Sequence, residues 1–408
     1  MKTVRALTET ESALRGWLQL GWLGKRRITA YGRILAVVSF ASLANSYRQA
    51  MGRTGSDFLA FWSAARLTVG GAQDRVYDLA ASGAIQAELG RTQVFAFVNP
   101  PPFLLLIYPL GYLSYAAAWV VWITVTYGLW LIAARRLDRQ LGWAIAAFPG
   151  ALVAAWHAQT GLLTGALMLA ASLLLPRRPM LAGLCIGCLV IKPHLAVLYP
   201  VALIAGRQWR ALLSAALGAS LSFALVALLL GRDVLLNYPE SWRVSRYLLE
   251  HGDAAFYLRQ GTIYAEVRLR AGPAAAAAVQ AVASLFCIVM VWRAWRGPAG
   301  TAWKNAFLLA VIPLATPYLF SYDLAFLVAP VIWLASDARD RPRGGWERAL
   351  VLCYYLAPLW TRALALPLGA NLLPLMDALM VWTLWQRRAF GAPDHGGQDQ
   401  AHREKAQG

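Results

Sequence analysis

The sequence predicts an all-α polytopic membrane protein with about twelve transmembrane helices, within a range of about ten to thirteen. Hydrophobic residues make up 59% of the 408 residues and charged residues only 14%, whereas soluble domains contain about 25% charged residues. Apolar runs recur from Arg33 to Arg388. A soluble protein of this size could not bury so much apolar surface, because core burial saturates as chains lengthen. The composition therefore argues against a soluble enzyme, a DNA-binding protein and a disordered chain.

Twelve apolar runs are candidate membrane spans, at 33–48, 108–134, 141–157, 160–175, 179–191, 194–206, 210–230, 274–293, 303–316, 318–336, 347–366 and 369–386. Several are shorter than the ~20 residues that a straight span needs. The pair 179–191 and 194–206 could form two short helices or one helix broken at Lys192-Pro193, because proline interrupts a helix interior.

The net charge of +18 is explained by membrane topology rather than by nucleic acid. Lys and Arg gather between the apolar runs in segments that alternate with nearly uncharged turns, and basic segments favour the cytoplasmic side. This pattern places both termini in the cytoplasm. It predicts a basic cytoplasmic segment over 1–32, a membrane domain over 33–390 and a disordered polar tail over 391–408. Within the first segment, Ala13–Leu23 could lie on the membrane as an amphipathic helix.

Two long segments, 49–107 and 231–273, are then extracytoplasmic and hold most of the remaining charged residues. In the first, the stretch from Ser56 to Arg66 predicts a short helix that ends at Gly70-Gly71 and lies along the outer membrane surface with one apolar face. Asp57 would either cap this helix or act as a general base at the lipid interface. The triple proline after Asn99 predicts a rigid entry into the next helix.

A second group of polar residues interrupts the apolar runs. Lysine at membrane depth is costly and usually functional, so Lys192 and His194, beside Pro193, could hold an anionic phosphate. Alternatively, Lys192 extends to the outer surface. Asp323, next to Tyr322, could pair with a basic residue of a site or cap its helix.

The turn residues His157 and Gln159 more often make ordinary hydrogen bonds. The sequence contains no zinc-protease, phosphate-binding-loop, serine-hydrolase or dinucleotide-binding motif. It therefore indicates no metal and no cofactor, and it argues against ATP-driven transport and serine hydrolysis by this chain.

The order of four motifs resembles glycosyltransferase family 87. The motifs are Asp57-Phe-x-x-Phe-Trp-x-Ala-Ala-Arg66 with Val76-Tyr77-Asp78, Asn99-Pro-Pro-Pro-Phe-Leu104 through Tyr108-Pro-Leu110, Ala182-Gly183 through Lys192-Pro193-His194, and Ala315-Thr-Pro-Tyr318 with Tyr322-Asp-Leu324. The resemblance spans roughly residues 50–335. Two positions depart from it: the family often has Gln where this chain has His194, and Gly-Gln where it has Ala158-Gln159.

This family is similar to the polyprenyl-phosphate-mannose-dependent mannosyltransferases of the GT-C superfamily. The resemblance implies a GT-C-type fold with short extracytoplasmic juxtamembrane helices, located in the inner (plasma) membrane with its active site facing the periplasm or exterior. It also implies an inverting transfer of a hexose, most often mannose, from a lipid-phosphate donor to a lipid or glycan acceptor, with Asp57 as the catalytic base.

The leaving polyprenyl phosphate needs charge stabilisation more than protonation. The residues expected to bind donor phosphate or substrate are Lys192, His194, Arg66, Tyr322, Asp323, Asn99 and Gln159. Two other hypotheses stay open, a lipid-linked-sugar transporter or flippase and a non-catalytic membrane assembly protein.

Overall fold

The computed structural model describes residues 24–53, 55–341 and 346–388. Within these ranges every regular element is a helix, and the sole β feature is an isolated antiparallel bridge between Gln260 and Phe320. The prediction of an all-α chain is therefore confirmed. The predictions for the amphipathic segment 13–23, for most of 1–32 and for the tail 391–408 lie outside the described residues.

The first half of the chain forms α2 (Lys25–Met51), α3 (Phe58–Val69), α4 (Leu79–Glu88), α5 (Pro102–Ile107), α6 (Tyr115–Ala134), α7 (Gly142–Ala146), α8 (Pro149–Trp156), α9 (Gly161–Leu174), α10 (Pro179–Gly187) and α11 (Tyr199–Ala205). The second half forms α12 (Trp209–Leu229), α13 (Asp233–Leu236), α14 (Pro239–His251), α15 (Ala254–Leu258), α16 (Ile263–Arg296), α17 (Thr301–Ala315), α18 (Val328–Asp340), α19 (Glu347–Leu368) and α20 (Leu373–Gln386). Short 3-10 helices join them, namely η1 (Gln73–Arg75), η2 (Tyr108–Tyr112), η3 (Arg139–Leu141), η4 (Cys188–Ile191), η5 (Pro193–Leu195) and η6 (Ser321–Leu327).

Each predicted span coincides with one or two of these helices. By length and composition, six helical segments of the described chain are able to cross a membrane: α2, α6, α12, α16, η6 with α18, and α19. The remaining spans correspond to shorter apolar helices such as α9, α10 and α17. The chain is thus a multi-pass membrane protein by its helices, and the total of twelve spans stays a prediction.

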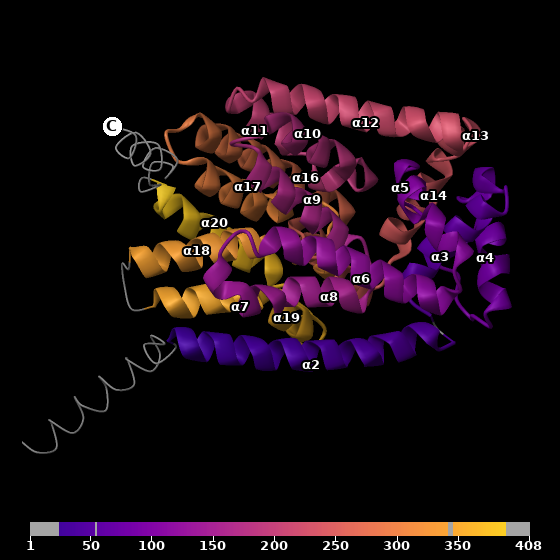
Figure 1. Cartoon of the computed structure of the whole chain (residues 1–408), viewed down its shortest axis with the longest axis horizontal. Coiled ribbons are helices and arrows are strands. Elements are labelled where there is room, and N and C mark those ends of the chain that lie inside the picture. Colours follow the sequence, from indigo (N-terminus) through magenta and orange to yellow (C-terminus); the bar gives the residue numbers. More distant parts are fainter. Residues whose placement is uncertain (1–23, 54, 342–345, 389–408) are drawn as a thin grey trace, which may run out of the picture.

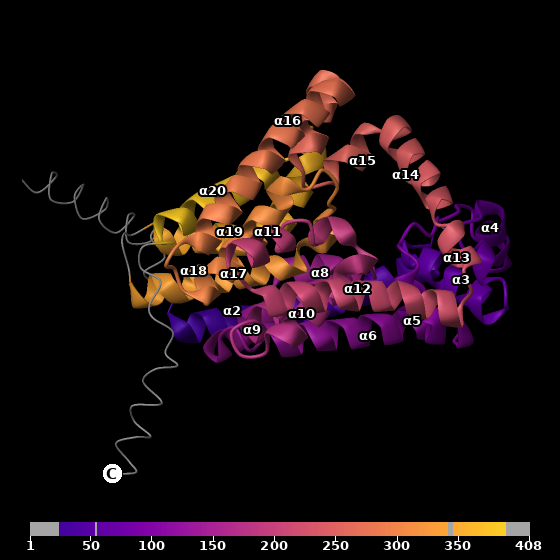
Figure 2. The same cartoon turned by 90° about the horizontal axis from the view of Figure 1, so that it is seen from above.

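The first long loop and the beginning of the second lie at one end of the elongated helical body, and the rest of the second loop leads back from there to α16. Figure 1 shows α2, α6 and α12 running lengthwise, with α3, α4, α5 and α13 gathered at the same end. In Figure 2, α13, α14 and α15 form an arm beside that end. The loops contact each other there, because Asn237 donates a hydrogen bond to the Asp74 carbonyl (2.8 Å) and the rings of Tyr77 and Tyr238 lie 5.6 Å apart.

The helices are interrupted at two places where a proline follows a residue with non-helical backbone angles. The pair 179–191 and 194–206 forms two short helices, α10 and α11, and between them Lys192 has φ −151°. Within α16, Gly272 has φ +83° immediately before Pro273, so the membrane part of this helix begins where the sequence predicts. Lys192 is thereby displayed at a helix break instead of on a continuous helix.

A close backbone contact brings η6 against the start of α9. A Cβ atom at Gly161 would lie only 1.9 Å from the Tyr322 carbonyl oxygen, so any side chain at this position would push the two segments apart. The absence of a side chain at Gly161 therefore allows the turn at 157–160 to meet η6, and both segments contribute to the candidate site.

Candidate active site

Asp57 lies at the N-terminus of α3, but its side chain makes no capping hydrogen bond. Its carboxylate instead accepts a hydrogen bond from Gln159 Nε2, with 3.1 Å between Nε2 and Oδ2. The residue is half-buried. The geometry does not show the capping role that was one of the two interpretations of Asp57. The carboxylate is therefore available to an incoming group.

The helix that presents Asp57 begins and ends as predicted, between Asp57 and Gly70. The prediction of one apolar face along the membrane surface is wrong. Side chains all around α3 are buried, and Arg66 is its one exposed residue. Phe61 packs on Phe103 (4.9 Å between ring centroids), and Trp62 donates to the Leu113 carbonyl (3.0 Å). α3 is therefore a rigid core element that fixes the position of Asp57.

The turn before Gln159 has an unusual backbone conformation that sets the direction of its side chain. The preceding residue, Ala158, is buried and has φ +47°, in the left-handed region that costs a residue with a Cβ about 1–2 kcal/mol. Glycine would adopt this conformation without that cost. The turn places the Gln159 amide between Asp57 and the backbone N–H of Thr160, which donates to Oε1 (3.4 Å).

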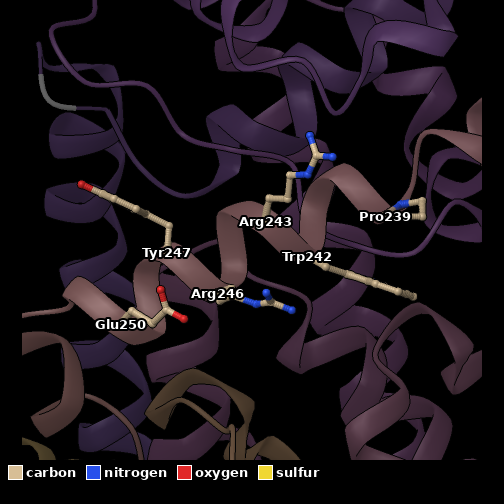
Figure 3. Close-up of a pocket in the computed structure, with 6 residues that line it drawn as sticks. All are labelled: Pro239, Trp242, Arg243, Arg246, Tyr247 and Glu250. Carbon is tan, nitrogen blue, oxygen red and sulfur yellow. The ribbon is translucent and has the colours of Figure 1, made fainter.

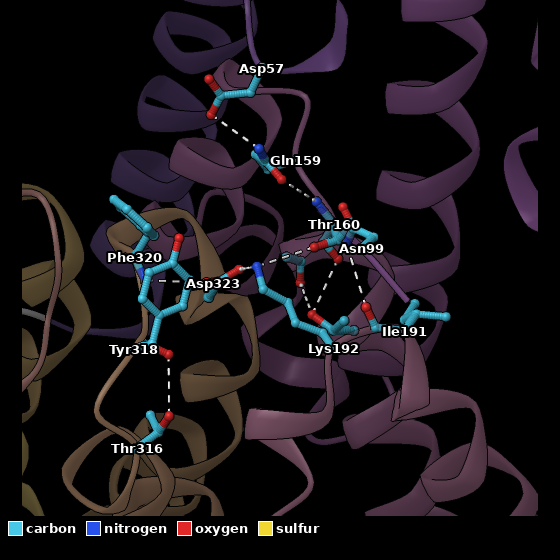
Figure 4. Close-up of polar contacts among 12 residues, drawn as sticks. Asp57, Asn99, Gln159, Thr160, Ile191, Lys192, Thr316, Tyr318, Phe320 and Asp323 are labelled. Carbon is cyan, nitrogen blue, oxygen red and sulfur yellow. Dashed lines mark hydrogen bonds and ion pairs between the residues drawn. The ribbon is translucent and has the colours of Figure 1, made fainter. Parts of the chain in front are cut away.

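Lys192 and Asp323 form a buried ion pair that continues this network. Lys192 Nζ lies 2.5 Å from Asp323 Oδ1 and 3.3 Å from Thr160 Oγ1, and the Phe320 N–H donates to Asp323 Oδ2 (3.2 Å). Figure 4 shows the resulting chain of polar contacts from Asp57 through Gln159 and Thr160 to Lys192 and Asp323. Lys192 therefore does not extend to the surface, and Asp323 both pairs with it and caps its own turn.

The other predicted residues lie around this network in different ways. Tyr322 faces Lys192, whose Nζ is 5.2 Å from the ring centroid. His194 stands edge-on to Tyr318, and its buried Nε2 has no hydrogen-bond partner within the described ranges. Asn99 donates to the Ile191 carbonyl at 3.4 Å, which ties the triple-proline segment to the residue before Lys192.

Arg66 stands apart from these residues. Its guanidinium donates to the Gly111 carbonyl (3.1 Å) and lies over the Trp62 ring. It makes no contact with Asp57 or Lys192 among the described residues, so the structure does not bring Arg66 to the site.

Arg362 on α19 is a site residue that the sequence analysis missed. Nη1 donates to Ser321 Oγ (2.5 Å), and Nη2 donates to His157 Nε2 (2.8 Å). His157 and Ser321 lie two residues before Gln159 and Asp323, so Arg362 joins the two turns of the site. A signal was present, because an arginine inside the apolar run 347–366 is costly unless it has a role.

A separate pocket lies on α14 and is lined by Pro239, Trp242, Arg243, Arg246, Tyr247 and Glu250, as Figure 3 shows. In the described part of the chain, none of these residues bonds to the network around Asp57. The described residues also contain no group of three or more His, Cys, Asp and Glu placed to hold a metal ion.

Comparison with protein-family models matches residues 97–321 to glycosyltransferase family 87. No curated protein and no solved structure matches the chain. The family match includes Asn99, Gln159, Lys192 and His194, whereas Asp57, Arg66, Tyr322 and Asp323 lie outside it. Because the match covers more than half of the chain, which is also rich in apolar helices, the protein belongs to glycosyltransferase family 87 and is a membrane glycosyltransferase.

Proposed function

We propose that this protein transfers a hexose, with mannose as the first sugar to test, from a polyprenyl-phosphate donor to a lipid or glycan acceptor. The transfer takes place at the extracytoplasmic face and inverts the anomeric carbon. The observation that supports this most directly is Asp57, a half-buried carboxylate that makes no capping bond and is held by a single side-chain hydrogen bond from Gln159.

Asp57 fits the part of general base. An acceptor hydroxyl is a weak nucleophile, and a carboxylate within hydrogen-bond reach removes its proton as the new bond forms. The acceptor oxygen then bonds to the anomeric carbon while the bond from that carbon to the donor phosphate breaks. Gln159 occupies one carboxylate oxygen, which leaves the other free to face the acceptor.

The extracytoplasmic face is supported by charge and by arrangement. Asp57 precedes α3, which Figure 1 shows at the end of the body together with α4 and α13, whereas Gln159 lies between α8 and α9, Lys192 between η4 and η5, and Asp323 in η6. The basic segments between the other helix ends favour the cytoplasm. A transporter would need polar residues along a path between both faces. The gathering of these residues into one connected network favours the enzyme over the transporter.

The test is sugar transfer by membranes that contain either wild-type protein or Asp57→Asn, with radiolabelled polyprenyl-phosphate-mannose as donor and polyprenyl-phosphate-glucose in a parallel arm. Asn keeps an oxygen for Gln159 but cannot accept a proton, so transfer should fall by about 10²–10⁴-fold. Asp74→Asn, at an exposed aspartate of the same loop, is the matched control and should transfer at the wild-type rate.

Equal transfer by wild type and Asp57→Asn, with both proteins folded in detergent, would remove Asp57 from the role of base. If wild type transfers neither sugar to any lipid or glycan acceptor, yet moves the donor across proteoliposomes, the flippase hypothesis replaces the enzyme.

A further inference from the structure

The lysine expected at the donor phosphate is already neutralised. Lys192 and Asp323 are 2.5 Å apart, and their side chains are only 10% and 1% exposed. Because the two opposite charges are so close, their fields largely cancel for any group farther away. An anionic donor phosphate near Asp57 therefore needs a different source of positive charge.

Arg362 supplies a cation that contacts the same two turns through other residues. It contacts His157 and Ser321 through two guanidinium nitrogens, and no carboxylate pairs with it within the described ranges. Because arginine donates and cannot accept, His157 Nε2 must be an unprotonated acceptor. The imidazole thus orients the guanidinium without cancelling its charge.

Arg259 brings a second cation to this place from the second external loop. Its carbonyl accepts a hydrogen bond from the Ser321 N–H (3.2 Å), and its neighbour Gln260 forms the backbone bridge with Phe320. The Arg259 side chain is exposed, and no ion pair forms with it among the described residues. Arg259 and Asp57 both lie within electrostatic range of Arg362.

Two guanidinium groups without carboxylate partners repel each other in the unliganded protein, and a bound anion relieves that repulsion. Guanidinium groups match the geometry of phosphate oxygens through paired hydrogen bonds. On these grounds we propose that Arg362 and Arg259 bind the phosphate group of the lipid-linked donor. This inference rests on the proposed function and assigns its phosphate site.

The assignment has a chemical consequence. When the bond between the anomeric carbon and the phosphate oxygen breaks, its electron pair goes to that oxygen and the phosphodiester becomes a phosphomonoester. The negative charge on the phosphate therefore increases during the reaction. Two fixed cations stabilise that added charge, so the lipid monophosphate product should bind more tightly than a lipid phosphodiester.

The experiment measures the dissociation constant of farnesyl phosphate for the full-length protein in nanodiscs, with inorganic phosphate in a second arm. Arg362→Gln removes hydrogen bonds between a charged donor and a charged acceptor, so it should weaken farnesyl phosphate binding at least about tenfold. Arg362→Lys should recover part of this loss. Arg348→Gln, at an exposed arginine of the same helix, should bind as wild type does.

Arg362 also holds two turns together, and its replacement could unfold the protein. Arg259→Gln, at an exposed side chain, tests the same site without that risk and should also weaken binding. Inorganic phosphate should bind more weakly than farnesyl phosphate but with the same dependence on Arg362.

Farnesyl phosphate binding that is unchanged in both folded variants, or absent from wild type, would overturn the assignment. Because the titration needs no sugar transfer, a wild type that transfers sugar while both variants bind normally refutes only the phosphate site. A wild type that binds farnesyl phosphate through Arg362 but transfers no sugar refutes the proposed reaction and keeps the site.

Discussion

The buried ion pair between Lys192 and Asp323 makes a quantitative prediction. Their charged atoms lie 2.5 Å apart, and the two side chains are 10% and 1% exposed. Replacing Lys192 by Met leaves an uncompensated carboxylate in the protein interior, and replacing Asp323 by Leu leaves an uncompensated ammonium. Each single change should therefore lower the free energy of unfolding by about 3–5 kcal/mol.

The double variant Lys192→Met with Asp323→Leu removes both charges and leaves apolar side chains of similar size. Apolar replacements of a buried ion pair are often neutral or stabilising. The double variant should then lie within about 1–3 kcal/mol of wild type, which is the cost of the Phe320 N–H that loses its acceptor. The expected coupling between the two positions is therefore several kcal/mol.

The assay is equilibrium unfolding in mixed detergent micelles, monitored by tryptophan fluorescence, for wild type, the single variants and the double variant. The exposed pair of Arg75 and Asp78, with 3.0 Å between its charged atoms, is the matched control. Its coupling should be only about 0–1 kcal/mol. If the effects of the Lys192 and Asp323 changes simply add, the argument that the pair is an interdependent buried unit is wrong.

Three further predictions follow from local geometry. Gln159→Leu should leave the protein folded but lower kcat for sugar transfer more than it changes KM, because Gln159 orients Asp57 without touching the reacting atoms; an unchanged kcat would contradict this. Ala158→Gly should change the free energy of unfolding by no more than about 1 kcal/mol, since glycine tolerates the positive φ and this gain offsets the loss of a buried methyl group. Ala158→Val should be clearly destabilising in the same assay, because a β-branched residue fits a positive φ poorly. The hydrogen bond from Arg75 lowers the pKa of Asp78. The stability that the ionised Asp78 carboxylate contributes is therefore present above the ordinary carboxyl pKa and is lost as pH falls through the lowered value. Asp78→Ala should also lower the free energy of unfolding by about 1 kcal/mol through the lost cap of α4. Asp78→Asn should keep most of the capping stabilisation but lose the pH dependence, which unfolding measurements near pH 7 and pH 3 would show.

Local patterns were enough to locate most helices. A polar residue at the start and a Gly-Gly pair predicted the ends of α3, Pro193 predicted the break at Lys192, and an apolar run predicted the start of the membrane part of α16. These features depend on neighbours in the sequence, because caps, prolines and glycines act within one or two turns. The one-sided burial expected for α3 failed for the opposite reason, since α4, α5, α6 and η2, which lie beyond its own turns in the sequence, pack around it.

The candidate site shows the same division. Composition and the order of motifs by themselves determined that the chain is a helical membrane protein and indicated its family, and they named Asp57, Gln159, Lys192 and Asp323 as candidate site residues. Which of these residues pair was decided by tertiary structure alone. The contact of Lys192 with Asp323 spans 131 residues and that of Arg362 with His157 spans 205. Sequence periodicity cannot encode such contacts, because they depend on how separate helices pack; that packing pairs Lys192 with Asp323 and brings Arg362 to His157 and Ser321.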